Sequence, residues 1–142
     1  MNIEPVITPF ILFSDTVIRE EGSGKLSIIG SFQHFNVARF PFVAPPFVVT
    51  VCFGNLRGKV DILHLTVRLE HSISGVVMSC VGSEMRLHGE ISPSDFFEVP
   101  IGLPPCQFTE PGSYSVVVLI NNEILGMRPL LIREISHPSR GP

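Results

Sequence analysis

The hairpin predicted for residues 114–132 constrains the fold more than any other part of the chain. Five of the seven residues in Tyr114–Ile120 are Val, Leu or Ile, and three of them are consecutive valines. Such β-branched side chains lose rotamer freedom in a helix but pack well on a pleated sheet. Asn121 and Asn122 follow, and asparagine tolerates the positive φ that a short hairpin loop requires. We therefore predict two antiparallel strands, the second being the apolar run Ile124–Ile132.

The first strand of this hairpin is apolar on both faces. One face carries Tyr114 and every second residue after it, and the other carries Val117 and Leu119. A strand that is covered on one face only would alternate between apolar and polar residues. This strand is therefore predicted to be central in its sheet, or to have its second face covered by a partner chain.

Pro111 and Gly112 precede the hairpin and predict a turn. Proline presets φ, and glycine supplies the positive φ of a type II turn. Tyr114 follows this turn. In immunoglobulin-like sandwiches a tyrosine at such a position donates its hydroxyl to backbone a few residues upstream, which forms a tyrosine corner. The other interpretation is a partly buried strand tyrosine whose hydroxyl contacts water, and the sequence leaves both open.

The rest of the chain also reads as strands. Apolar residues alternate with polar ones from Leu63 to Glu70, and no segment sustains helical periodicity over three turns. Gly and Pro punctuate about nine such segments, a spacing typical of sandwiches. We predict an all-β fold, a two-sheet antiparallel β-sandwich of immunoglobulin-like or jelly-roll-like form. A single domain over residues 1–135 is expected, followed by a flexible tail at residues 136–142.

Composition excludes several classes of partner. The net charge is −3 and the basic residues are scattered, so nucleic acid is not expected as a partner. No apolar run approaches the roughly 18 residues of a membrane span. The first residues lack a basic segment, so we expect no secretory signal and a cytoplasmic protein. With 44% hydrophobic and 16% charged residues, the apolar surplus predicts a subunit interface, most simply in a homo-oligomer.

Motifs for chemistry are weak. The three cysteines are widely spaced with no CxxC pair, which indicates reduced, mostly buried thiols and no zinc knuckle. His64 and His88 fall on polar strand faces and would make a two-histidine metal site if their strands were neighbours. We favour the simpler explanation, an ordinary exposed charged face with cross-strand pairs. Asp15 and Arg19 are predicted to form a structural ion pair that fixes the first hairpin. No catalytic residue and no cofactor are expected.

The opening of the chain resembles a known family. Residues 11–19 read Ile-Leu-Phe-Ser-Asp-Thr-Val-Ile-Arg, and residues 24–30 read Gly-Lys-Leu-Ser-Ile-Ile-Gly. With the Phe-Pro loop at residues 39–42 and the Pro-Gly-Ser-Tyr run at residues 111–114, this pattern is similar to that of small uncharacterised bacterial proteins that share a domain of unknown function. The resemblance implies a β-sandwich with an immunoglobulin-like C-terminal half, and no activity. Ser14 stands where such openings often have cysteine, which argues against a thiol site there.

The sequence therefore predicts a non-enzymatic β-sandwich module for binding or assembly, with protein, foremost a second copy, as the partner. The alternative is a small-molecule or metal-binding protein, possibly a hydrolase, that uses the polar sheet face around His64 and His88.

Overall fold

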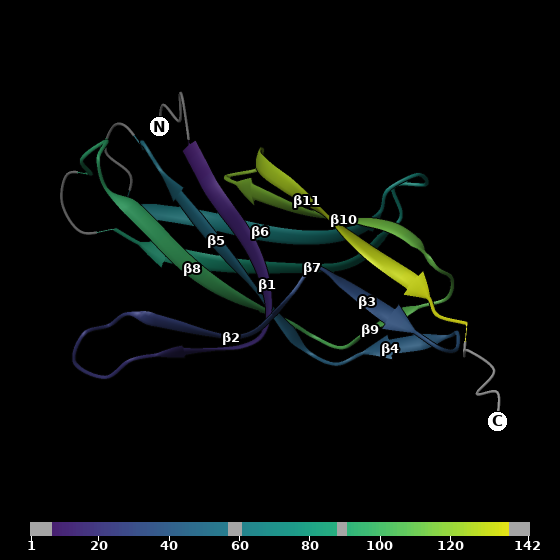
Figure 1. Cartoon of the computed structure of the whole chain (residues 1–142). Coiled ribbons are helices and arrows are strands. Elements are labelled where there is room, and N and C mark those ends of the chain that lie inside the picture. Colours follow the sequence, from purple (N-terminus) through teal and green to yellow (C-terminus); the bar gives the residue numbers. More distant parts are fainter. Residues whose placement is uncertain (1–6, 57–60, 88–90, 137–142) are drawn as a thin grey trace.

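The computed structural model describes residues 7–56, 61–87 and 91–136 (Figure 1). In this part of the chain all regular structure is extended, in eleven strands. The strands are β1 (Ile7–Arg19), β2 (Leu26–Phe32), β3 (His34–Val37), β4 (Phe42–Ala44), β5 (Phe47–Gly54), β6 (Ile62–His71), β7 (Val77–Arg86), β8 (Phe96–Leu103), β9 (Cys106–Phe108), β10 (Gly112–Ile120) and β11 (Glu123–Glu134).

The strands form three sheets. A four-stranded sheet has the order β2-β1-β5-β8, a five-stranded sheet has the order β3-β11-β10-β6-β7, and β4 pairs with β9. All pairs are antiparallel except β3 with β11, which is parallel and makes the five-stranded sheet mixed. The all-β prediction is confirmed. The simple two-sheet antiparallel sandwich, immunoglobulin-like or jelly-roll-like, does not describe this arrangement.

Proline and a short crossover account for the difference. Strand β4 lies between Pro41 and Pro45, and β9 directly follows Pro105, so both strands stop at three residues. Proline cannot donate to a ladder and confines strands to short edge positions. A single residue separates β2 from β3. Over this short connection the chain crosses to the second sheet, where β3 pairs in parallel with β11.

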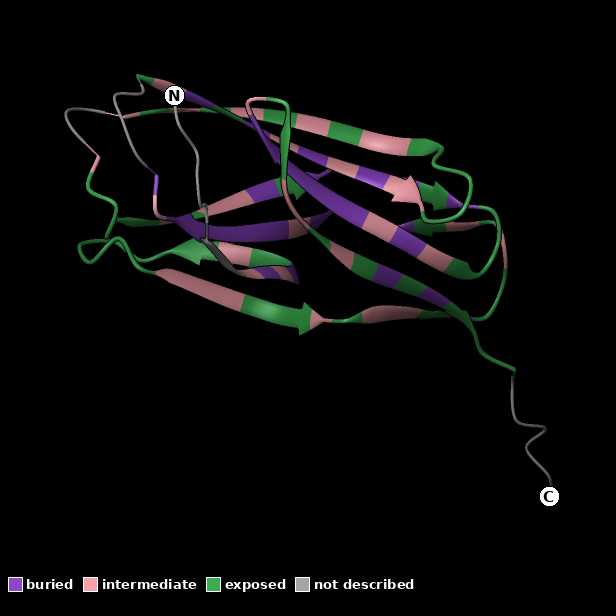
Figure 2. Ribbon diagram, turned by 90° about the horizontal axis from the view of Figure 1, so that it is seen from above, coloured by how far each residue is buried: buried purple, intermediate pink, exposed green. Residues whose placement is uncertain are grey.

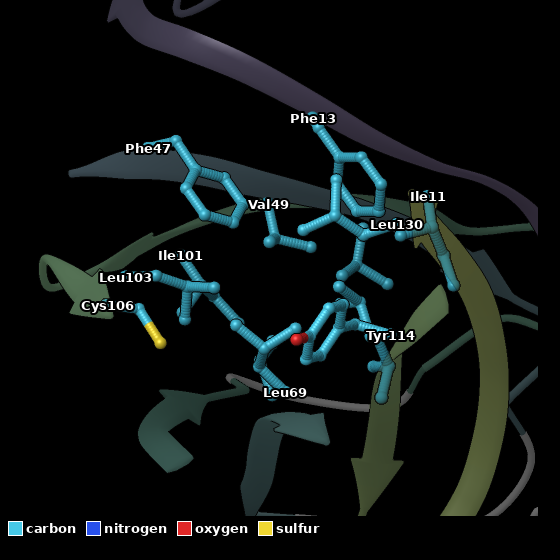
Figure 3. Packing of buried hydrophobic residues seen from close by; sticks show 14 of the residues in the cluster. Ile11, Phe13, Phe47, Val49, Leu69, Ile101, Leu103, Cys106, Tyr114 and Leu130 are labelled. Atoms are coloured by element: carbon cyan, nitrogen blue, oxygen red, sulfur yellow. The ribbon is translucent and has the colours of Figure 1, made fainter. Parts of the chain in front are cut away.

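The hydrophobic core lies between the two larger sheets. Side chains of β1, β5 and β8 meet those of β6, β10 and β11, as Figure 3 shows for Phe13, Val49, Leu69 and Tyr114. Figure 2 shows the buried residues gathered on the inner strands, and the exposed ones in the loops and in bands along the outer strands. The alternation predicted from Leu63 to Glu70 is confirmed, since the four apolar side chains of that run are fully buried.

The predicted hairpin is present. Asn121 and Asn122 have φ values of 47° and 68°, and Ile120 pairs with Glu123 across this two-residue loop. Positive φ at both loop residues matches the twist of the flanking strands. Strand β10 lies between β11 and β6, so the prediction that it is central is confirmed. On its second face Val117 and Leu119 are also buried.

Strand β7 runs without interruption from Val77 to Arg86. Gly82 forms no turn because it lies opposite Thr66, inside the continuous ladder with β6. The predicted tail at residues 136–142 lies outside the described residues from His137 onward.

Thr50 in β5 is an exception to the pairing of buried polar groups. Its side chain is fully buried, and its hydroxyl has no hydrogen-bond partner among the described residues. Ser14 in β1 is equally buried, but its hydroxyl donates to the carbonyl oxygen of Thr16 at 3.2 Å. A buried polar group without a partner loses its hydration and gains nothing in exchange. The Thr50 hydroxyl therefore destabilises the folded state.

Replacing Thr50 with valine is expected to raise the free energy of unfolding by about 1 kcal/mol, because valine keeps the shape and removes the unpaired hydroxyl. Urea denaturation measures this as a higher midpoint at an unchanged slope. The matched variant Ser14→Ala removes a bonded hydroxyl and is expected to lower the midpoint. If Thr50→Val is destabilising as well, the hydroxyl has a partner and this account is wrong.

Candidate functional site

The most distinctive feature of the surface is an arm formed by residues 15–30. Strand β1 pairs with β5 only as far as Ser14, which lies opposite Val48. Its pairing with β2 continues to Arg19, opposite Leu26. Beyond Ser14 the two strands therefore form a two-stranded ribbon that leaves the sheet, visible at the lower left of Figure 1. A ribbon of only two strands is marginally stable by itself, so its order needs local support.

The loop at the end of the arm supplies this support. The Glu20 carboxylate accepts hydrogen bonds from the hydroxyls of Ser23 and Ser27, both at 3.1 Å. Arg19 donates through a guanidinium nitrogen to the carbonyl oxygen of Gly24 at 2.8 Å. The predicted ion pair between Asp15 and Arg19 is absent from the structure. Residues four apart on one strand are separated by about 13 Å, too far for an ion pair.

Asp15 instead marks the base of the arm. It lies opposite Gly30 of β2, which has a φ of 71°. The Asp15 carboxylate occupies the space where a side chain at position 30 would begin, with its Cγ 2.8 Å from the ideal Cβ position. The positive φ favours glycine at position 30, and a side chain there would require the Asp15 carboxylate to move. The register between β1 and β2 stays the same on either side of this pair.

The arm exposes apolar side chains. Ile18 on β1 and Ile29 on β2 are 52% and 46% exposed, on the same face of the ribbon. On the other face Val17, Leu26 and Ile28 are only partly buried. These residues were not among the candidates predicted from the sequence. The signal that was available is the absence of charge from residues 26–32, where a solvent-facing strand normally carries some.

A cleft of about 420 Å³ separates the arm from the beginning of β8. Arg19 and Lys25 line it on the arm side, and Phe96 and Glu98 line it on the β8 side. Phe96 is exposed, and its ring lies over Gly54 of the neighbouring strand β5. The cleft is shallow and carries charges of both signs, which does not favour a ligand of one charge.

The polar face of the five-stranded sheet carries His64. Its Nδ1 lies 3.6 Å from a carboxylate oxygen of Glu84, directly opposite on β7, and both side chains are mostly exposed. His88, the second residue of the hypothetical metal pair, lies outside the described residues. Within the described ranges, no group of three or more His, Cys, Asp or Glu side chains is placed to hold a metal ion. What is visible is a cross-strand pair on a solvated sheet face.

A second histidine lies beside Tyr114. The Tyr114 hydroxyl donates to the carbonyl oxygen of Glu110 at 2.9 Å, which is the hydrogen bond that the tyrosine-corner interpretation predicts. Gly112, between them, has a φ of 150°, a value that requires glycine. His71 lies edge-on to the Tyr114 ring and accepts a hydrogen bond from the Ser74 amide through Nδ1. Its Nε2 therefore carries the proton and faces the Glu110 carboxylate at 3.5 Å.

This histidine is not arranged as a general base. A base needs one ring nitrogen that is free to take a proton from a nucleophile. The ring of His71 has its acceptor nitrogen engaged by backbone and its donor nitrogen aimed at a carboxylate. The group instead ties the β6–β7 turn to the segment that precedes β10.

The chain matches a known protein family. The Family of unknown function (DUF6941) matches residues 9–133, which include the arm, both large sheets and the tyrosine corner. The chain belongs to DUF6941. A search of curated proteins gives no match. The match agrees with the resemblance in one respect, namely that the chain carries a domain of unknown function; it shows neither a bacterial origin nor an immunoglobulin-like half.

The three cysteines of this DUF6941 chain are free thiols. Burial raises the pKa of the Cys106 thiol. Burial, and secondly the negative charge of Glu98 opposite it, raises the pKa of Cys52. Both thiols therefore stay protonated at neutral pH and are poor nucleophiles. Cys80 on β7 is exposed. Nowhere in the described ranges is there a helix long and apolar enough to cross a membrane.

Proposed function

We propose that this DUF6941 protein is a non-enzymatic β-sandwich module for protein binding and assembly, and that its partner is a second copy of itself. The observation that carries the proposal is the arm, which projects as a ribbon and exposes Ile18 and Ile29. Its loop is fixed by hydrogen bonds within the arm, so the ribbon is ordered before any partner arrives. A preorganised apolar surface loses little entropy on binding.

The site chemistry supports a binding role over an enzymatic one. His64 and His71 each face a glutamate, and the two buried thiols have raised pKa values. The raised pKa values disfavour thiolate nucleophiles, and both ring nitrogens of His71 are already engaged, so none of these groups is prepared for reaction. Within the same proposal, the protein acts in the cytoplasm, where its thiols stay reduced. The net charge of −3 supports protein over nucleic acid as the partner.

Sedimentation equilibrium over a wide range of protein concentration tests this proposal. The expected result is a mass that rises from one chain to two as concentration increases, with unchanged circular dichroism. Apolar contact predicts that self-association survives high salt, since screening weakens only the exposed charges. A protein that sediments as a single chain at every concentration contradicts the proposal.

A further inference from the structure

The edge strands of the two larger sheets differ in how they are protected. An edge strand offers unpaired backbone groups to other strands, and natural proteins block such edges with charge or proline, or keep them very short. Strand β8 carries Pro100, and β7 carries Glu84 and Arg86. The part of β11 that β3 leaves uncovered carries Pro129, and β3 has only four residues.

Strand β2 lacks each of these protections. It has seven residues, none of them charged and none of them proline. It pairs with β1 on one side, and no other described strand pairs with its second side. The open edge of β2 is therefore the most exposed template for strand addition in the described part of the chain.

The sequence of β2 also suits one occupant in particular. It reads Leu-Ser-Ile-Ile-Gly-Ser-Phe, which is nearly symmetric about Ile29. When two copies pair antiparallel with Ile29 opposite Ile29, apolar residues face apolar residues and serines face serines. The pairs are Leu26 with Phe32, Ser27 with Ser31, and Ile28 with Gly30, each formed twice.

This register also joins the exposed isoleucines. Ile18 lies on β1 opposite Ser27, and therefore diagonal to Ile29 on the same face. Pairing about Ile29 makes a four-stranded ribbon in which two isoleucines from each copy form one stripe. Direct and diagonal neighbours on one face of a sheet are within contact distance for such side chains. Gly30 does not prevent the pairing, since β2 already holds it in a continuous register with β1.

We infer that the protein forms a two-fold symmetric dimer in which the open edge of β2 pairs antiparallel with β2 of a second copy, centred on Ile29. The inference rests on the proposed function and specifies the surface and register of the assembly. It joins two four-stranded sheets into one sheet of eight strands.

Disulfide trapping tests the register. In a Cys80→Ser background, Ile29→Cys is expected to form a covalent dimer under mild oxidation, because directly opposed residues have Cβ atoms about 5 Å apart. The matched control is Ile18→Cys, which is equally exposed and on the same face. In the paired arms its two copies are separated by three strand spacings, about 14 Å, so no cross-link is expected.

Two further measurements complete the test. Ile29→Lys is expected to weaken self-association about tenfold or more, because like charges then oppose each other across the axis. The control Ile124→Lys, at an exposed position on the other sheet, is expected to leave self-association unchanged. In the unmodified protein, hydrogen exchange of the amides in Leu26–Phe32 is expected to slow as concentration rises, which requires no variant to fold.

The possible outcomes distinguish failure of the β2 edge pairing from failure of the proposed self-association. A dimer that Ile29→Cys does not trap, with exchange in β2 independent of concentration, overturns the β2 pairing but leaves assembly standing. If Ile18→Cys forms the covalent dimer as readily as Ile29→Cys, the two arms pack face to face, and this result also overturns the edge pairing of β2. A single chain at every concentration overturns both.

Discussion

Replacing Arg128 with alanine is expected to lower the free energy of unfolding by about 3 kcal/mol. Arg128 lies on β11 opposite Val116, so its side chain points between the sheets. There its guanidinium donates to the carbonyl oxygen of Ile11 on β1 and lies over the ring of Phe13, 4.7 Å from the centroid. The Arg128 side chain thus joins β1 of the four-stranded sheet to β11 of the five-stranded sheet.

Both contacts are stronger than average because the charge is only partly hydrated. A hydrogen bond from a charged donor contributes about 1.5–3 kcal/mol and a cation over an aromatic ring about 0.5–2 kcal/mol. Alanine removes both and leaves the Ile11 carbonyl without this donor. Arg128→Lys keeps the charge but lacks the planar fork, so an intermediate loss is expected.

Urea denaturation followed by circular dichroism measures the loss. The matched control is Arg133→Ala on the same strand, whose side chain is exposed. A surface substitution of this kind changes stability by no more than about 0.5 kcal/mol. If Arg128→Ala and Arg133→Ala have equal midpoints, the bridge between the sheets contributes nothing to stability.

Local features were predictable because their causes lie in adjacent residues. The loop at Asn121 and Asn122 follows from the positive φ that asparagine tolerates, and the alternation after Leu63 follows from one buried sheet face. The tyrosine corner was one of two open interpretations, because the Pro-Gly-Ser-Tyr order sets its spacing but not the direction of the hydroxyl. In each case the pattern spans fewer than ten residues.

The features that the sequence analysis missed depend on distant pairings. The bridge made by Arg128 connects residues 117 apart, for which no local pattern exists. The first hairpin was expected, but its projection from the sheet was not, because only the end of the pairing between β1 and β5 at Ser14 shows where the ribbon leaves the sheet. Sheet order, and with it the open edge of β2, is likewise a property of the whole chain.

The second large effect is expected at high pH, where ionisation of Tyr114 should unfold the protein. Burial raises the pKa of Tyr114 above its ordinary value of 10.0, and the negative charge of Glu110 and the neighbouring Cys106 raise it further. The side chain is 2% exposed, and it packs against Phe108 with ring centroids 4.8 Å apart. Ionisation would bury a charge and remove the hydrogen that is donated to the Glu110 carbonyl.

The sign of the pH dependence follows from linkage. The unfolded chain loses the phenolic proton at a lower pH than the folded chain, so above the ordinary pKa the unfolded state binds fewer protons. Stability from this group is therefore fully present below about pH 10 and is lost as pH rises through the folded-state pKa. Urea midpoints recorded at increasing alkaline pH should fall over this window.

Tyr114 is the single tyrosine of a chain without tryptophan, so absorbance of the phenolate reports this residue alone. The native protein should show a delayed, steep titration that coincides with the loss of circular dichroism, whereas protein in urea should titrate near its ordinary pKa. Tyr114→Phe is expected to lower stability at neutral pH by about 1 kcal/mol and to flatten the alkaline slope of the midpoints. Glu110→Gln keeps the backbone acceptor and removes the carboxylate charge, so it should move the native titration toward lower pH. A native titration at the same pH as in urea would show that the hydroxyl is hydrated, and the buried corner would then be wrong.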